Sequence, residues 1–315
     1  MKRKFAEREM KGMERENKPY LALLLTTCLW GSLYVGNKFV LGILPPYTVL
    51  EGRYLAALVA MVPVLLVRPR QKLEKGDWKY ILLLGGLGYA VAISMQTLGT
   101  KFSNASLGSL FNSLNPVVII LMAVPLLGEK ITRSKVLALV SSLIGVYVIV
   151  GGGLEGDIAL GIFFSLLSVV LWSFVSVCMR KVTQKYDPFM LTTYGVVVAF
   201  LCLLPVSLGE LAAVNFQIQL NWKLVLIIAY MGICCTGLTH FMWNWALSRV
   251  EAGKCSLFYP IQPLSASILG ALLLREEVGP RFVIGGLLIV GGILISVLGD
   301  RKPAGALPKG GSSNG

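Results

Sequence analysis

Long apolar runs, separated by short clusters of charged residues, make up almost the whole chain. A helix needs roughly 20 apolar residues to cross the hydrocarbon core of a bilayer. The apolar runs predict ten such helices, at residues 20–41, 46–67, 80–100, 103–127, 136–153, 158–179, 188–208, 223–247, 254–274 and 282–299. The connections are too short to hold a soluble domain. The expected fold class is therefore an all-α integral membrane protein with ten transmembrane helices.

The composition is that of a membrane protein. Of the 315 residues, 55% are hydrophobic and 14% are charged, whereas soluble domains carry about 25% charged residues. The net charge of +13 does not indicate nucleic acid binding, because the basic residues lie between the apolar runs instead of forming one face. The predicted partner is the lipid bilayer, and nucleic acid is excluded.

Basic residues are unevenly divided between the two ends of the predicted helices. With the amino terminus in the cytoplasm, the inner loops hold thirteen Lys and Arg residues and the outer loops hold four. Because cytoplasmic loops carry an excess of these residues, we predict a multi-pass plasma-membrane protein with both termini cytoplasmic. Residues 1–18 are expected to form a basic cytoplasmic tail without a cleaved signal peptide. Residues 301–315, rich in Gly, Pro and Ser, are expected to form a disordered tail.

The two halves of the chain match each other in a consistent order. LWGSLYVGNK at 29–38 aligns with LWSFVSVCMR at 171–180, and ASLGSLFNSLNP at 105–116 aligns with AGKCSLFYPIQP at 252–263. The halves, 19–153 and 154–300, each contain five predicted helices. Because five is odd, the halves insert with opposite orientation. Inverted repeats of this kind are a transporter architecture, with the substrate site near the membrane midplane between the repeats.

The fourth predicted helix carries polar residues where lipid makes them costly. Ser109, Asn112 and Pro116 fall on one helical face, at i, i+3 and i+7. Proline also frees the carbonyl four residues earlier, so the carbonyl of Asn112 is expected to contact a substrate. The ninth helix repeats the pattern. Either these faces line a wet cavity, or the kinks and amides are satisfied by neighbouring helices.

Other polar and aromatic side chains lie near the middle of helices 1, 3, 6 and 8. On helices 1 and 6 they form stripes centred on a tryptophan, which is placed for packing or for lining a cavity and not for a belt at the membrane surface. The candidate substrate-binding residues, which share a mid-span position, are Trp30, Tyr34, Tyr89, Gln96, Asn112, Asn115, Trp172, His240, Trp243, Asn244, Tyr259 and Gln262. The candidate helix-breaking residues are Pro116, Pro260 and Pro263.

Together these motifs resemble the ten-helix EamA branch of the drug/metabolite transporter superfamily. The resemblance is carried by Trp30 and Trp172, by Pro46 followed by Arg53, and by ASLGSLFNSLNPVVIILMAVPLLGEKIT at 105–132 with its weaker copy at 252–279. It implies an exporter of small metabolites, often amino acids or related compounds, that works by alternating access. It also implies a central cavity lined by helices 1, 3, 4, 6, 8 and 9, with helices 5 and 10 at the periphery.

Few ionisable residues lie within the predicted helices. His240, the only histidine, is either a satisfied structural group or a proton carrier. Glu51 and Arg53, at i and i+2 in the outer part of helix 2, point to different faces. We expect Glu51 to reach Lys38, which otherwise extends to the outer interface. We expect Arg53 to contact outer carbonyls, which favours a structural role over a substrate contact.

Two glutamates close the polar helices of the two halves. Glu129 ends helix 4 and Glu276 ends helix 9. A carboxylate gains nothing from the dipole at a helix C-terminus. We therefore expect both residues to pair with basic loop residues or to hold a packing contact at a helix end.

No catalytic or metal-binding constellation is present. The sequence has no G-x-x-x-x-G-K-[ST] motif, no G-x-S-x-G elbow and no histidine cluster, and its six cysteines lie in apolar runs as small hydrophobes. We predict no enzyme, no cofactor and no metal. A secondary transporter is weighed against a non-transporting scaffold or receptor, and the inverted duplication with polar midplane faces favours the transporter.

The predicted lining of the cavity indicates a substrate class. It is aromatic and neutral, with no midplane Asp or Glu for an organic cation and no midplane Lys or Arg for a phosphate. This favours a neutral or zwitterionic, partly apolar metabolite such as an amino acid. Export is implied by the resemblance alone. Proton antiport through Glu51 or His240 and uncoupled exchange both remain open, as do the identity of the substrate and the oligomeric state.

Overall fold

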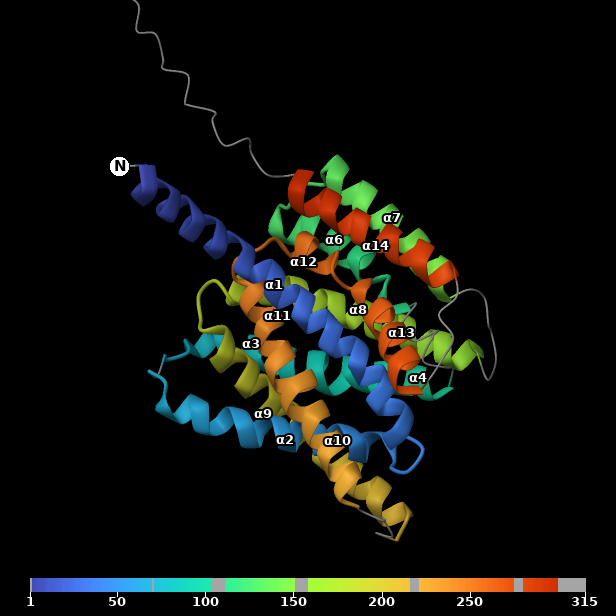
Figure 1. Cartoon of the computed structure of the whole chain (residues 1–315). Coiled ribbons are helices and arrows are strands. Elements are labelled where there is room, and N and C mark those ends of the chain that lie inside the picture. Colours follow the sequence, from blue (N-terminus) through green and yellow to red (C-terminus); the bar gives the residue numbers. More distant parts are fainter. Residues whose placement is uncertain are drawn as a thin grey trace, which may run out of the picture.

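The computed structural model describes residues 2–69, 71–102, 111–150, 158–215, 221–274 and 280–299. All regular elements in these ranges are helical, and they fall into ten successive spans, as predicted (Figure 1). Six of these helices are long and apolar enough to cross a membrane: Asn17–Asn37, Pro46–Val67, Lys75–Phe102, Ala159–Val182, Pro188–Ala213 and Trp222–Leu247. Ser109, Glu276 and the tail from residue 301 lie outside the described residues.

The first half of the chain forms spans 1 to 5. Its helices are α1 (Lys2–Val40), α2 (Pro46–Val67), η1 (Lys75–Asp77), α3 (Trp78–Leu82), η2 (Leu83–Ala92), α4 (Ile93–Phe102), α6 (Asn115–Leu127) and α7 (Arg133–Val150). Helix α1 continues through the basic amino-terminal segment. Span 3 is one rod from η1 to α4 whose middle part, η2, is π-helical.

The second half forms spans 6 to 10. Its helices are α8 (Ile158–Val182), α9 (Pro188–Ala213), α10 (Trp222–Gly232), η3 (Ile233–Leu238), α11 (Thr239–Leu247), α12 (Ala252–Ser256), α13 (Ile261–Leu274) and α14 (Pro280–Gly299). The third helix of this half again contains a π-helical stretch, η3. Turns interrupt the fourth helix of each half, at residues 113–114 before α6 and at residues 257–260 between α12 and α13.

Prolines and polar caps fix where several helices begin. Pro46 and Pro188 lie in the first turn of α2 and α9, where the missing backbone N–H has no partner to lose. Asp187 caps α9 and Asn221 caps α10, each accepting a hydrogen bond of 2.9 Å from the backbone N–H three residues later. Gly128 ends α6 with φ +68°, a left-handed conformation that suits glycine.

The most extensive helix contacts join the two halves. Each of these contacts that a helix of the first half makes with the second half is repeated by its counterpart in the second half. Helix α1 packs on α13 and α11, while its counterpart α8 packs on α6 and α4. In the same way η2 packs on α9, and η3 on α2. The remaining large contacts pair counterparts, α2 with α9 and α7 with α14, and Figure 1 shows each pair side by side. Exchanging the halves therefore maps the bundle onto itself, as inverted repeats require.

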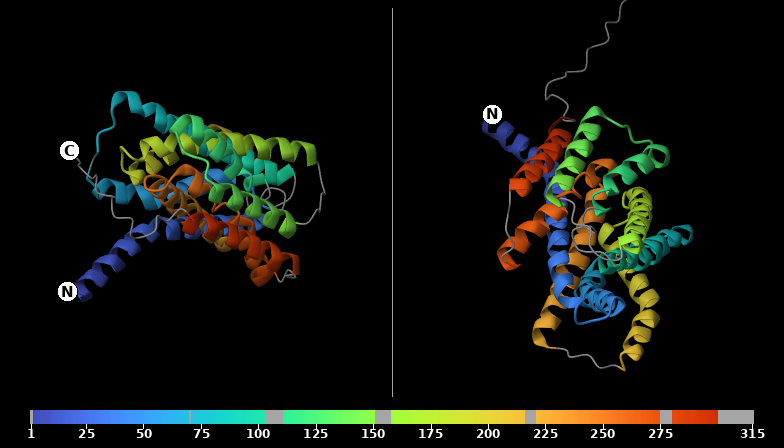
Figure 2. Two further views of the ribbon diagram at one scale, coloured as in Figure 1. Left: turned by 90° about the horizontal axis from the view of Figure 1, so that it is seen from above. Right: turned by 90° about the vertical axis from the view of Figure 1, so that its right-hand side faces the viewer.

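The bundle has apolar outer faces, and its largely apolar interior also contains polar side chains. Leu66, Leu201, Leu272 and Leu287 are among the exposed large hydrophobic side chains, which suits contact with lipid. Buried residues include many with hydroxyl or amide groups, such as Asn112. Helices α7 and α14 lie at one edge of the molecule, as Figure 2 also shows. Seven of the other eight spans contribute side chains to the polar centre of the bundle.

Candidate functional site

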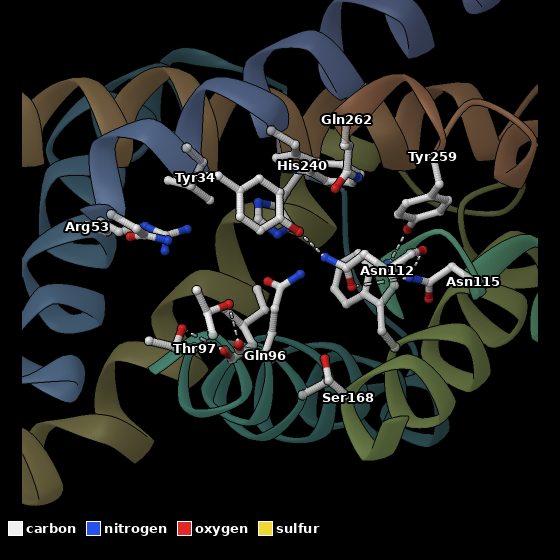
Figure 3. A pocket seen from close by; sticks show the side chains of 17 residues that line it. Tyr34, Arg53, Gln96, Thr97, Asn112, Asn115, Ser168, His240, Tyr259 and Gln262 are labelled. Carbon is white, nitrogen blue, oxygen red and sulfur yellow. Dashed lines mark hydrogen bonds between the residues drawn. The ribbon is translucent and has the colours of Figure 1, made fainter. Parts of the chain in front are cut away.

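A cavity lies at the polar centre, between the two halves. Its open volume is about 50 Å³, comparable with a few water molecules. Spans 1, 2, 3, 4, 6, 8 and 9 contribute side chains to it, as Figure 3 shows. The lining residues are Trp30, Leu33, Tyr34, Asn37, Arg53, Ala92, Ile93, Gln96, Thr97, Thr100, Asn112, Asn115, Ser168, Trp172, His240, Tyr259 and Gln262.

Aromatic side chains from both halves meet at one wall of the cavity. The rings of Trp30 and Trp172, which match each other in the sequence repeat, lie 6.3 Å apart at 81°. Tyr259 stacks on Trp30 at 5.8 Å and accepts a hydrogen bond from Nε1 of Trp172. Aromatic pairs of this kind contribute about 0.5–1.5 kcal/mol beyond burial. The wall is therefore rigid, apolar on its ring faces and neutral.

His240 packs against the aromatic side chains of this wall. Its ring lies 4.5 Å from Tyr89, 5.6 Å from Trp172 and 5.7 Å from Trp30. Its Nδ1 lies 2.6 Å from the carbonyl oxygen of Thr236. Because a carbonyl can only accept, Nδ1 carries the hydrogen, and in the neutral ring Nε2 is then the acceptor. His240 can thus offer a hydrogen-bond acceptor beside the cavity.

Amides from the interrupted span 4 also line the cavity. Asn112 donates through Nδ2 to the Tyr34 hydroxyl. Asn115 donates to the backbone carbonyl of Asn112 at 2.8 Å, and Ser173 donates to Oδ1 of Asn115 at 3.1 Å. Pro116 lies in the first turn of α6, so the helix break precedes it. The carbonyl that we expected to meet a substrate is instead bound by the neighbouring asparagine.

Span 9 satisfies its freed carbonyls in a similar way. The carbonyl of Ser256 accepts from the backbone N–H of Tyr259 at 3.0 Å, and that of Tyr259 accepts from Gln262 at 2.9 Å. Pro260 and Pro263 therefore shape a turn without leaving these two carbonyls open. Two side chains reach the cavity from this part of span 9, that of Tyr259 from the turn and that of Gln262 from the start of α13.

Nine of the twelve candidate residues line the cavity, and three stand behind its wall. Asn244 donates to the Tyr89 hydroxyl at 3.2 Å and to the Thr192 hydroxyl at 2.9 Å. The Trp243 ring packs 5.0 Å from that of Tyr259 and is 1% exposed. The structure thus places Tyr89, Trp243 and Asn244 as supports of the lining residues.

Of the two charged residues of span 2, Arg53 departs from its expected contact, and the expected partner of Glu51 has its side chain outside the described part. Arg53 does not reach outer carbonyls; its Nε and Nη2 donate to the Thr236 hydroxyl at 3.2 and 3.0 Å, and it lines the cavity. Both carboxyl oxygens of Glu51 are buried without a hydrogen-bond partner among the described residues. The side chain of Lys38 lies outside the described part. A charge within a span is costly in lipid, so the long side chain of Arg53 turns inward.

Eight further residues line the cavity, and five of them are polar: Asn37, Arg53, Thr97, Thr100 and Ser168. Asn37 follows Trp30 by seven residues and Tyr34 by three, so it shares their helical face. Thr97 flanks the predicted Gln96, and for Arg53 the sequence favoured a structural role over a substrate contact. For Asn37 the periodicity that identified its neighbours is a sufficient signal. For Arg53 the signal is its charge within a span.

Glu129 closes one end of the bundle by joining three segments. Its carboxylate accepts from the backbone N–H groups of Ala252 at 2.7 Å and Gly253 at 3.0 Å, at the start of α12. It also lies 3.5 Å from Nζ of the buried Lys135, which contacts Glu251 at 2.7 Å. The expected pairing of Glu129 with a basic residue is thus observed. A carboxylate at the amino end of another helix is also favourably placed.

Comparison with known proteins adds a family and a fold. Residues 17–151 and 159–298 match the model of the EamA-like transporter family. A protein of Archaeoglobus fulgidus, described as an uncharacterized transporter, is 25% identical over 280 residues, which cover 89% of this chain and 99% of that protein. One of Clostridium kluyveri, described in the same words, is 28% identical, covering 90% and 94%. A solved crystal structure with 20% identity superposes with a TM-score of 0.74 over 89% of this chain and 96% of that one.

Proposed function

The chain belongs to the EamA-like transporter family, and from this premise we propose that it carries a small neutral or zwitterionic metabolite, such as an amino acid, out of the cell. The family consists of multi-pass membrane transporters, not enzymes. The observation that carries the proposal is the central cavity, whose wall combines aromatic rings with neutral hydrogen-bonding groups from both halves. Transport through it is the function that this arrangement supports best.

Alternating access is supported by the pairing of irregular helices. The π-helical stretches η2 and η3 and the turns at residues 113–114 and 257–260 occupy corresponding places in the two halves. Interrupted helices next to a midplane site are typical of transporters built from inverted repeats. We propose that the halves exchange conformations at these places, which opens the cavity first to one side of the membrane and then to the other.

The charge distribution supports the orientation and the division of the chain. We propose that the two repeats are residues 19–153 and 154–300. We further propose that the protein lies in the plasma membrane with both termini in the cytoplasm. The excess of Lys and Arg in the assigned inner loops supports this orientation. Green fluorescent protein fused to the carboxyl terminus should then fold and fluoresce. A correctly inserted but dark fusion would contradict the orientation.

A flux screen tests the function. We expect the purified protein in proteoliposomes to carry at least one labelled amino acid above the flux of empty liposomes. We expect Trp30→Ala and Asn112→Ala to lower this flux without preventing insertion. A sugar phosphate carried faster than every amino acid would overturn the substrate class, and no flux of any solute would overturn transport.

The same proteoliposomes show whether protons are coupled to transport. Flux is compared with and without a pH gradient, for the wild type and for His240→Gln. A proton-carrying His240 predicts that the gradient drives flux in the wild type and that the variant loses this dependence. Equal transport by the two proteins at every pH would exclude the role.

A further inference from the structure

The central cavity has one cationic pole. Arg53 is the only lysine or arginine among its lining residues, and no aspartate or glutamate is among them, within the described part of the chain. Figure 3 shows Arg53 at one end of the cavity, with Asn112 and Tyr259 toward the other. The cavity therefore carries a single fixed positive charge at one end and neutral groups elsewhere.

The guanidinium of Arg53 is held in place but not neutralised. The residue is 2% exposed. Its Nε and Nη2 both donate to the Thr236 hydroxyl, which itself donates to the carbonyl of Met231 at 2.9 Å. Nη1 has no hydrogen-bond partner and the group has no carboxylate partner among the described residues. A guanidinium offers five N–H donors, so most of its donors remain available on the side of the cavity.

The nearby acid on the same helix does not serve as the counterion. Glu51 lies two residues before Arg53 and on a different face of α2, and its buried oxygens meet no hydrogen-bond donor in the described residues. A buried charge without a partner is strongly unfavourable. An anion that arrives with the substrate would compensate Arg53 each time the cavity is filled.

We propose that Arg53 binds the carboxylate of the substrate, so that the transported metabolite is a monocarboxylate whose partly apolar body is uncharged or carries one ammonium group. The planar fork of arginine matches the two oxygens of a carboxylate. The aromatic wall of Trp30, Trp172 and Tyr259 then faces the body of the substrate. An ammonium group on that body is attracted by the faces of these rings. A phosphate monoester, with a charge of about −1.5 to −2, is poorly matched by a single arginine.

This assignment rests on the proposed function, and paired substrates separate the two. In proteoliposomes the labelled standard L-amino acids are compared with their C-terminal amides, which keep the side chain and the amino group but lack the carboxylate. We expect the wild type to prefer the best amino acid over its amide at least about tenfold, the effect of one lost charge-assisted hydrogen bond. We expect Arg53→Gln to abolish this preference while still carrying the amide.

Three variants make the result specific. Arg53→Lys keeps the charge without the fork, and we expect it to restore part of the preference. Thr236→Val removes the group that holds the guanidinium, and we expect it to reduce the preference less than Arg53→Gln does. Arg249→Gln, at an exposed position in the turn after α11, removes a positive charge outside the cavity and should leave the preference intact.

The outcomes distinguish the two claims. Amides carried as well as amino acids by the wild type would overturn the role of Arg53 and leave transport standing. A preference that survives Arg53→Gln in an inserted, monodisperse protein would do the same. If Arg53→Gln does not fold, the wild-type comparison of acid and amide still decides. No flux of any probe would overturn the proposed function and this assignment together.

Discussion

At the scale of single residues, Arg53 and Glu51, two positions apart on α2, lie in different surroundings. Arg53 turns to the cavity and finds a hydroxyl, whereas Glu51 is buried with neither carboxyl oxygen hydrogen-bonded in the described residues. An unsatisfied buried polar group costs about 1–3 kcal/mol. A carboxyl group buried in this way is therefore expected to lower the stability of this conformation.

Replacing Glu51 tests this cost. We expect Glu51→Met, which keeps the length and apolar stem of the side chain, to stabilise the protein by about 1–3 kcal/mol. The melting temperature in detergent measures the change. The control Glu51→Gln remains polar and buried, so it should recover much less. A lower melting temperature for Glu51→Met than for the wild type would show that the carboxyl group is bound after all.

Helical periodicity is sufficient to predict which residues face the interior, but not which of them line the cavity and which lie behind the lining. Asn112, Tyr34 and Gln262 were found because a polar group in a span must face the interior. Trp243 and Asn244 satisfy the same rule, yet they stand one layer behind the lining. An interior face is wider than the part that meets the cavity, and only the packing of other spans decides between the two.

At the scale of elements, the crossing of α1 and α13 depends on a missing side chain. A Cβ atom on Gly31 would lie 1.6 Å from Oγ of Ser265 and 2.6 Å from the backbone oxygen of Gln262. Ser265 can rotate, but a helix backbone cannot retreat without moving α13. This contact sets the distance between span 1 and span 9, which both line the cavity.

Adding a methyl group at this crossing should separate the helices. We expect Gly31→Ala to destabilise the protein by about 1–3 kcal/mol, seen as a lower melting temperature. The double variant Gly31→Ala, Ser265→Ala should recover only part of the loss, because the clash with the backbone remains. Gly86→Ala is the matched control, since a Cβ there meets no atom within 4 Å. Equal melting temperatures for Gly31→Ala and Gly86→Ala would disprove the close crossing.

The helix breaks show where prediction from sequence ends at this scale. Proline marks a break, and the breaks in spans 4 and 9 were expected from Pro116, Pro260 and Pro263. The turn before α6 precedes Pro116, because proline is well accommodated in a first helical turn. The π-helical stretches η2 and η3 were not predicted. η2 contains three glycines, η3 contains one, and neither contains proline. Hydrophobic periodicity cannot distinguish such stretches from α-helix.

At the scale of the whole molecule, an ionic bridge joins the loops of the two halves. Lys185 lies 2.7 Å from Asp77 and 2.8 Å from Glu74, and Tyr186 donates to Asp77 at 2.6 Å. Asp77 first and Glu74 second raise the pKa of Lys185 above its ordinary value of 10.5. The stabilisation that accompanies a raised pKa is complete below the ordinary pKa of lysine. It is lost only as the pH rises through the pKa of Lys185 in the folded protein.

The bridge should therefore be insensitive to pH in the neutral range. We expect Lys185→Met to lower the melting temperature slightly, by the same amount from about pH 6 to about pH 9. The difference should shrink as salt is added, because the groups are partly exposed and screened. Lys181→Met, a matched lysine at the end of α8, serves as the control. A difference that grows with pH across this range would contradict the assignment.

The exchange of contacts between the halves has a consequence for biosynthesis. The ribosome delivers spans 1 to 5 first, yet α1 finds its main partners in α11 and α13, and α6 finds its own in α8. Lys135 likewise meets Glu251 only after most of the chain has been made. Until then the polar flanks of the nascent first half have only lipid or insertion factors beside them. The polypeptide must therefore mature late and concertedly, and a prematurely terminated product should be recognised and degraded.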